Sequence, residues 1–174
     1  MRLLFITQDF APDYGGVQTY SWEMAHRLSD RVAALEVLAP NRPAAPPVDR
    51  SAPFPVTRLS CRPAHLPFAL LPMLARRACT QKTDVVLHAQ WQTVGASVLS
   101  HILTGYPRRV VCAAHGRELL FNPVQGVPVL ETTYEQLRAF LLRQVDLFLP
   151  VSHYTAGLLQ DCGLSAAQTP VVPN

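Results

Sequence analysis

Short apolar runs alternate along the chain with stretches whose apolar residues recur at helical spacing. The first run, Leu3 to Ile6, is continuous, which is typical of a strand buried on both faces of a sheet. A polar loop with Gly15-Gly16 follows, and then apolar residues recur at helical spacing from Val17 to Leu28. The pattern predicts strands at 3–6, 32–39, 55–59, 84–89, 109–114, 146–151 and 170–173. It predicts helices at 17–28, 66–78, 94–103, 129–143 and 154–162.

Seven short strands that alternate with helices predict an α/β fold with an open, mainly parallel, Rossmann-like sheet and helices on both faces. A length of 174 residues fits one domain. Ligands of such sheets gather outside the carboxyl ends of the strands. The loops after Thr7, Ala89, Ala114 and Val151 are therefore the expected location of chemistry.

Several local features refine this outline. Six prolines between Pro40 and Pro55 predict an extended loop, and Pro72 predicts a kink or a late start in the helix at 66–78. Ser152 is a good N-cap for the last helix, which Gly163 should end. The apolar face of the helix at 129–143 is expected to include Leu130, Leu137, Phe140 and Leu141.

Composition and charge exclude several classes of protein. Fifteen basic and twelve acidic residues give a net charge of +3, which does not indicate a nucleic-acid-binding protein. The four cysteines, Cys61, Cys79, Cys112 and Cys162, are far apart and contain no C-x-x-C pair, so we expect reduced, mostly buried thiols in a cytoplasmic protein. No stretch approaches the roughly 20 apolar residues of a membrane span.

Peripheral membrane contact stays open. Residues 66–74 are apolar and precede Arg76-Arg77 and Lys82, as in an interfacial helix at the inner face of a membrane. A helix packed in the core with a solvated basic end is the favoured alternative.

The loop at Gly15-Gly16 is the first candidate site. It joins a strand end to a helix N-terminus, where glycines permit close approach and free N–H groups attract an anion. Neither the P-loop nor the dinucleotide motif is present, so a simple tight turn remains an alternative. Asp13 and Tyr14 in this loop, and Gln90 and Trp91 after another strand, are placed to reach a substrate.

His115 is the second candidate, because it follows the most strand-like stretch of the chain and precedes Gly116. Histidine forms versatile hydrogen bonds near neutral pH, and Glu118 lies in the same loop. His88 stays undecided, and the remaining histidines are interpreted as structural or solvated: His26, His65, His101 and His153. Ser152, the third candidate, is first of all a helix cap, although a helix N-terminus at this edge could also hold a ligand group.

Four motifs occur in order along the chain. They are Asp9-Phe10-Ala11-Pro12 with Gly15-Gly16-Val17, then His115-Gly116-Arg117-Glu118, then Val151-Ser152-x-Tyr154-Thr155, and finally Val171-Val172-Pro173-Asn174. In order and spacing this set resembles the retaining GT-B glycosyltransferases of family 4, and the resemblance spans the whole chain.

The resemblance implies a two-domain enzyme of the hexosyltransferase type, active in carbohydrate biosynthesis. Its N-terminal domain binds the acceptor, which is a glycan, a lipid-linked molecule or a small molecule, and its C-terminal domain binds most of the nucleotide sugar. Gly15 and Gly16 would approach the donor diphosphate and His115 would lie at the reaction centre, while Gly116, Glu118 and Ser152 shape the site. Neither a metal nor another cofactor is expected, since helix dipoles and basic side chains would stabilise the leaving diphosphate.

The resemblance covers the acceptor side alone. The family motif normally continues past Pro173-Asn174 into a hinge and the nucleotide-sugar-binding domain, which are absent here. Residues 1–174 are thus expected to form a single acceptor-side domain that does not complete a transfer by itself. A domain fragment is favoured over a separately encoded donor half. Two other functions stay open: a non-catalytic flavodoxin-like binding domain, and one half of a GT-B nucleotide-sugar epimerase.

Overall fold

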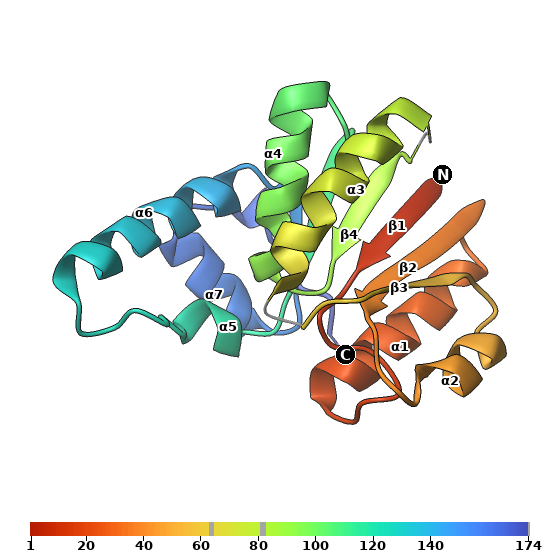
Figure 1. Ribbon diagram of the computed structural model, residues 1–174. Coiled ribbons are helices and arrows are strands. Elements are labelled where there is room, and N and C mark those ends of the chain that lie inside the picture. Colours follow the sequence, from red (N-terminus) through yellow and green to blue (C-terminus); the bar gives the residue numbers. More distant parts are fainter. Residues whose placement is uncertain (63–64, 81–82, 174) are drawn as a thin grey trace.

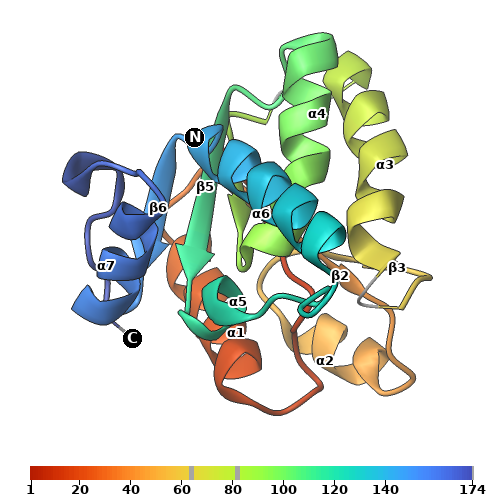
Figure 2. The same cartoon turned by 90° about the vertical axis from the view of Figure 1, so that its left-hand side faces the viewer.

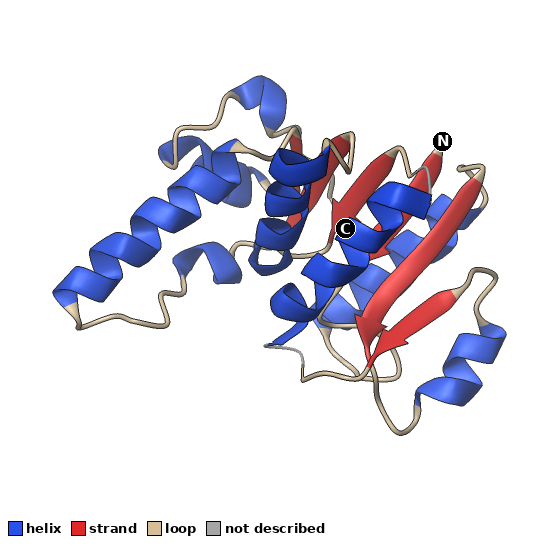
Figure 3. Cartoon of the chain, turned by 45° about the horizontal axis from the view of Figure 1, so that its top comes forward, coloured by secondary structure: helices blue, strands red, loops and turns tan. Residues whose placement is uncertain are grey.

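Six parallel strands form one sheet in the computed structural model, which describes residues 1–62, 65–80 and 83–173 (Figures 1 and 3). The strands are β1 (Arg2–Ile6), β2 (Ala34–Pro40), β3 (Val56–Leu59), β4 (Val85–His88), β5 (Arg109–Ala114) and β6 (Leu147–Pro150). Their order in the sheet is β3-β2-β1-β4-β5-β6. This is the order of doubly wound Rossmann sheets and differs from the flavodoxin order 2-1-3-4-5. The predicted fold class is confirmed, and the flavodoxin-like alternative does not fit this order.

Helices cover both faces of the sheet, as predicted (Figures 1 and 2). They are α1 (Gly16–Ser29), α2 (Ala45–Ser51), α3 (Leu66–Thr80), α4 (Val94–Thr104), α5 (Arg117–Leu120), α6 (Pro128–Arg143) and α7 (His153–Asp161), with 3-10 turns at Trp91–Thr93 and Ala166–Gln168. On one face, Leu3 and Phe5 of β1 pack with Ala25 of α1. On the other face, Leu4 packs with Leu70 of α3. This alternation explains why the β1 run is apolar at every position.

Two predictions about proline-rich segments are wrong. The segment from Pro40 to Pro55 contains α2, because its prolines at 46 and 47 fall in the first helical turn, where a missing N–H costs no hydrogen bond. Residues 170–173, all described, form no strand. Val172 N donates to Pro150 O at 2.9 Å, but flanking prolines cannot donate further ladder bonds.

The inner side of the apolar helix α3 packs into the core. For that side, the favoured prediction of a core helix over an interfacial helix is confirmed. Leu66, Leu70 and Leu74 are fully buried, whereas Phe68 is 80% exposed. The helix begins six residues before Pro72, so the predicted late start is wrong. Lys82, the last of the basic residues considered with this helix, lies outside the described residues.

The predicted apolar face of α6 does not face the core as a whole. Leu130, Leu137 and Phe140 are exposed, and only Leu141 of the predicted set packs against the core. The periodicity identified the helix correctly but could not show which side a neighbour covers. The cysteine prediction is also partly wrong: the thiols are free, but only Cys112 is fully buried.

The predicted helix ends are confirmed. Ser152 Oγ accepts a hydrogen bond from Thr155 N at 3.1 Å at the start of α7. Gly163 follows Cys162, the C-cap of α7, with a φ of 90°, a left-handed conformation that favours glycine.

His88, at the end of β4, is a structural core residue. It is fully buried, with Nδ1 2.7 Å from Thr93 Oγ1 and Nε2 2.9 Å from Ser97 Oγ. Burial lowers its pKa to about 3. The two hydroxyls satisfy both ring nitrogens, which lets a neutral imidazole sit inside the sheet-helix interface.

This burial predicts a specific acid sensitivity. Between about pH 6.5 and 3 the unfolded chain binds a proton at His88 that the folded chain excludes, so the stability of the fold decreases as the pH falls. Each pH unit in this window should cost about 1.4 kcal/mol through this group. In urea unfolding at pH 7, 6 and 5, a His88→Gln variant should start less stable but show the shallower pH dependence. Equal slopes for the two proteins would contradict this assignment.

Candidate functional site

Three loops meet at the carboxyl edge of the sheet, where the strand order reverses between β1 and β4. Ile6 of β1 pairs in register with His88 of β4, and His88 pairs with Cys112 of β5. The loops that follow these strands carry Gly15-Gly16, Gln90 and His115. The sheet therefore brings the predicted sequence motifs to the edge where open α/β sheets bind ligands.

The glycine turn opens onto a cavity of about 640 Å³. The cavity is lined by Tyr14, Gly15, Gly16, Thr19, Tyr20, Glu23, Met24, Arg27 and Pro173. Gly15 is the N-cap of α1, and no side chain caps this helix. The first turn of a helix presents N–H groups that have no partner within the helix, and its dipole favours an anion. A Cβ on Gly16 would point into open space, so this glycine is not required by packing.

Asp9 ties the glycine loop to the neighbouring strand end. Its Oδ1 accepts a hydrogen bond from Gln18 Nε2 at 3.0 Å, and its Oδ2 accepts one from Gln90 Nε2 at 2.7 Å. One carboxylate thus links the first turn of α1 to the loop after β4. The second amide atom, Gln90 Oε1, is buried and has no hydrogen-bond partner among the described residues.

Arg58 of β3 holds the other end of this loop. Its guanidinium donates to Ala11 O at 2.6 Å and to Pro40 O at 3.1 Å, and forms an ion pair with Asp49 of α2 at 2.7 Å. It also lies 5.4 Å from the centre of the buried Phe10 ring. Five donors in a fixed plane allow one arginine to fix three segments together.

Asp13 and Tyr14, the two other predicted site residues of this loop, lie in different environments. Asp13 Oδ2 accepts a hydrogen bond from Arg42 Nε at 2.6 Å, and this ion pair holds the carboxylate to the segment after β2. Tyr14 is 99% exposed and reaches the rim of the cavity.

His115 is held by its backbone and by one ring nitrogen. Its N–H donates to Glu118 Oε1 at 2.6 Å, and its Nε2 lies 3.1 Å from Ala89 O. Because a carbonyl oxygen only accepts, Nε2 carries the proton and Nδ1 is left as the acceptor. Burial lowers the pKa of His115, and the carboxylates of Glu118 and Asp9 offset this in part. The ring is therefore a neutral imidazole at neutral pH.

Tyr20 connects His115 to the cavity. Its ring meets the imidazole edge-on, with centroids 4.7 Å apart at 86°, and the same residue lines the cavity beside the glycines. The pKa of Tyr20 is raised to about 12, mainly by burial, so it stays a neutral phenol. Sequence reasoning placed Tyr20 on a helix face but gave it no role in the site.

Gly116 allows the sharp turn after His115. Its φ is 97°, a conformation that disfavours side chains, and a Cβ there would lie 3.1 Å from Thr155 Oγ1. Ser152 is the N-cap of α7, as predicted, and its Oγ is 3.0 Å from the same Thr155 hydroxyl. The start of α7 thus packs against the His115 turn.

Trp91 supports the site from the core. It is 6% exposed, and its Nε1 donates to Glu118 O at 2.9 Å. This bond fixes Glu118, whose carboxylate accepts the hydrogen bond from His115 N. Trp91 and Glu118 therefore act on the shape of the His115 loop.

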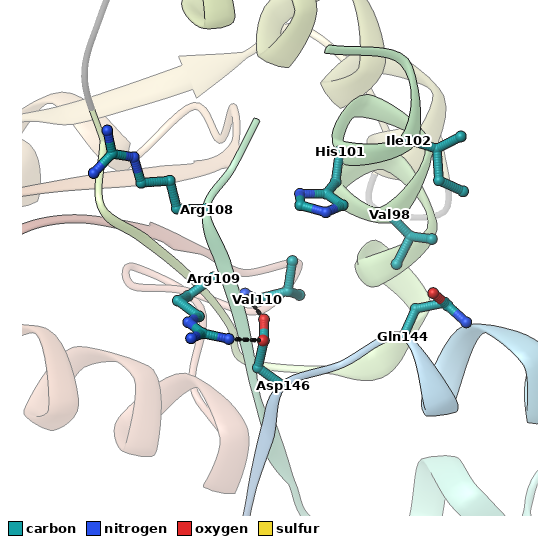
Figure 4. A pocket seen from close by; sticks show the side chains of 8 residues that line it. All are labelled: Val98, His101, Ile102, Arg108, Arg109, Val110, Gln144 and Asp146. Carbon is teal, nitrogen blue, oxygen red and sulfur yellow. Dashed lines mark hydrogen bonds and ion pairs between the residues drawn. The ribbon is translucent and has the colours of Figure 1, made fainter. Parts of the chain in front are cut away.

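A second, smaller cavity lies at the opposite edge of the sheet (Figure 4). It measures about 180 Å³, and Arg109 at its side pairs with Asp146 at 2.6 Å. The start of β5 lines it, so it is remote from the carboxyl ends of the strands. Among the described residues, no group of three or more His, Cys, Asp or Glu side chains could hold a metal ion.

Sequence reasoning missed the residues that join the motifs to one another. Asp9 appeared there only as part of a motif, and Gln18, Tyr20 and Arg58 had no predicted role in the site. The usable signal was position: Asp9 lies two residues past the buried Thr7, just beyond a strand end.

Comparisons with known proteins agree with this architecture. Anabaena HepE, solved in complex with UDP-glucose, superposes with a TM-score of 0.68 at 19% identity over 100% of this chain and 44% of its own. For the lipopolysaccharide outer core galactosyltransferase WaaB, the TM-score is 0.66 at 12% identity, over 100% of this chain and 46% of WaaB. For sucrose-phosphate synthase from Thermosynechococcus elongatus, the TM-score is 0.70 at 13% identity, over 99% of this chain and 48% of the synthase. The chain spans less than half the length of each of these structures, and no curated protein sequence matches it.

At these identities the structures establish the fold. The assignment to a family comes from the sequence. The family model Glycosyltransferase Family 4 matches residues 14–174, which include the glycine turn, the His115 loop and the start of α7. The chain belongs to glycosyltransferase family 4.

Proposed function

We propose that this chain is the acceptor-binding half of a retaining glycosyltransferase that transfers a sugar from a nucleotide-sugar donor, and that a C-terminal GT-B domain supplies most of the donor site. The observation that carries the proposal is the cavity of about 640 Å³ at the N-terminus of α1, with Gly15 and Gly16 in its wall and neutral His115 behind Tyr20. Solved relatives of the same fold are complexes with UDP and UDP-glucose, which supports a donor of this class.

In this proposal the glycine turn approaches the donor diphosphate. Gly16 begins α1, where backbone N–H groups and the helix dipole favour negative charge. The absence of a side chain at Gly16 leaves open space beside the backbone. As the diphosphate leaves, its developing charge would be stabilised by these fixed dipoles together with basic groups of the second domain, without a metal ion.

His115 would act through Nδ1 at the reaction centre. With Nε2–H donating to Ala89 O, Nδ1 accepts a hydrogen bond from a hydroxyl of the transferred sugar or the acceptor. Glu118 and Gly116 fix the direction of the ring through the backbone. Gln90 Oε1, buried without a partner among the described residues, offers a second acceptor for a substrate hydroxyl.

An epimerase half is the second candidate, because UDP-GlcNAc 2-epimerases share the fold, with a TM-score of 0.62 at 13% identity for the enzyme from Methanocaldococcus jannaschii. Epimerisation requires groups that remove and return a proton. Each carboxylate described at this edge already has a partner. Asp9 and Glu118 accept hydrogen bonds from the side-chain amides and from His115 N. Asp13 pairs with Arg42, and Glu23 in the cavity wall pairs with Arg27. The observed bonds therefore favour transfer.

A methyl group at Gly16 tests the donor contact. In the two-domain parent, Gly16→Ala should lower kcat/KM for the nucleotide sugar by about tenfold or more, because the added atom occupies the approach to the diphosphate. Gly157→Ala in α7 is the matched control, since its Cβ also meets open space. Both variants should unfold at or slightly above the wild-type temperature. Equal transfer rates for the two variants would refute a diphosphate contact at Gly16.

Substitution of His115 tests the reaction centre. His115→Ala should lower kcat by about a hundredfold, through loss of a positioned hydrogen bond. Wild-type activity should also fall on the acid side, at a pH below the ordinary histidine range, as Nδ1 becomes protonated. This acid limb should be missing in the variant when kcat is measured against pH. A variant that keeps the wild-type limb would assign that ionisation to another group.

A further inference from the structure

Among the described residues, half of the large apolar side chains that are exposed lie in a single segment, residues 117–143, which we name the α5–α6 arm. They are Leu120, Phe121, Val127, Val129, Leu130, Leu137 and Phe140. Val129 is 77% exposed. Single exposed apolar residues are common, but a concentration of them marks a surface that binds a partner or a membrane.

The helix α6 carries apolar side chains on its exposed side as well as on its core side. At 100° per residue, Val129 and Phe140 fall on one side, which is exposed, while the fully buried Leu142 lies opposite. Two of its charged residues lie toward the protein: Arg138 donates to Leu119 O at 2.7 Å and pairs with Glu135 at 2.5 Å. Contacts within this chain therefore do not explain the apolar side chains on the outward side.

The most exposed charged residues of the arm are positive. Arg117 and Arg143 are exposed, one at each end. In this segment, all of which the structure describes, the acids are partly buried and bonded: Glu118 to His115 N, Glu131 to Gly126 N and Glu135 to Asn122 Nδ2. The arm thus presents apolar side chains flanked by arginines, which complements a negatively charged lipid surface.

The position of the arm suits such a surface. α6 projects away from the sheet (Figure 1), and α5 lies beside the carboxyl end of β5, the edge that carries His115 (Figure 2). Among the described residues no helix is long and apolar enough to cross a membrane. The arm would therefore lie along the interface without spanning it.

We propose that the α5–α6 arm is a peripheral membrane-binding surface that inserts its apolar side chains between the headgroups of anionic phospholipids. Insertion is driven by removal of the apolar side chains from water, and Arg117 and Arg143 add attraction to the lipid phosphates. This assigns membrane contact to the arm and not to α3, whose Leu66, Leu70 and Leu74 are occupied by the core. The proposal does not depend on the transferase function, but it would hold the His115 edge beside the lipid surface.

Vesicle sedimentation with the chain tests this surface. Binding should be strong to vesicles of phosphatidylglycerol and phosphatidylcholine, weak to phosphatidylcholine alone, and reduced by salt. Phe121→Ser should weaken binding to the anionic vesicles by about tenfold, because one inserted ring is lost. Arg117→Gln should weaken it by about fivefold.

Phe68→Ser on α3 is the matched control, because Phe68 is also an exposed phenylalanine, and it should bind like the wild type. Absence of binding to anionic vesicles, or a loss in Phe68→Ser with none in Phe121→Ser, would overturn the proposal. So would light scattering that shows a dimer in the wild type and a monomer in Phe140→Ser, because a second copy would then cover the arm. Circular dichroism of each variant verifies that it is folded.

Discussion

The whole site depends on the parallel arrangement of β1, β4 and β5. Parallel strands end at the same edge, so the loop after each strand meets its neighbours there, however far apart they lie in sequence. Asp9 uses this proximity, since its carboxylate accepts hydrogen bonds from Gln18 and from Gln90, which lies 81 residues away. The carboxylate fixes the start of α1, and with it the glycine turn, relative to the loop beside His115.

Competition between burial and charge sets the state of His115. The carboxylates of Asp9 and Glu118 favour a protonated ring, but desolvation is larger and the pKa is lowered. Glu118 is turned to the backbone of His115, and Ala89 O receives the one ring proton. The result is a partly buried hydrogen-bond acceptor with a fixed direction, on the same edge of the sheet as a helix N-terminus that favours anions. The proposed reaction needs both features: the His115 acceptor to orient a hydroxyl, and the helix N-terminus to hold a diphosphate.

The sequence was sufficient for elements whose signal is local. Leu3 to Ile6 predicts a buried strand because every position is apolar, and Ser152 predicts a helix start through its own hydroxyl. The short helix α2 was missed because its prolines were counted as breakers and not as first-turn residues. The exposed side of α6 was missed because periodicity does not show what covers a face. The links from Asp9 to Gln90 and from Arg58 to Ala11 span distant segments, so no local pattern contains them.

Calorimetric titration of this chain with a nucleotide sugar tests whether the chain supplies the acceptor side and the glycine turn but not the main donor site. We expect weak binding to the 174-residue chain, with a Kd of about 1 mM or weaker. Such binding should be tightened greatly when a donor domain is joined to it. A Kd of about 1 μM for the chain alone would contradict the proposed division of the site.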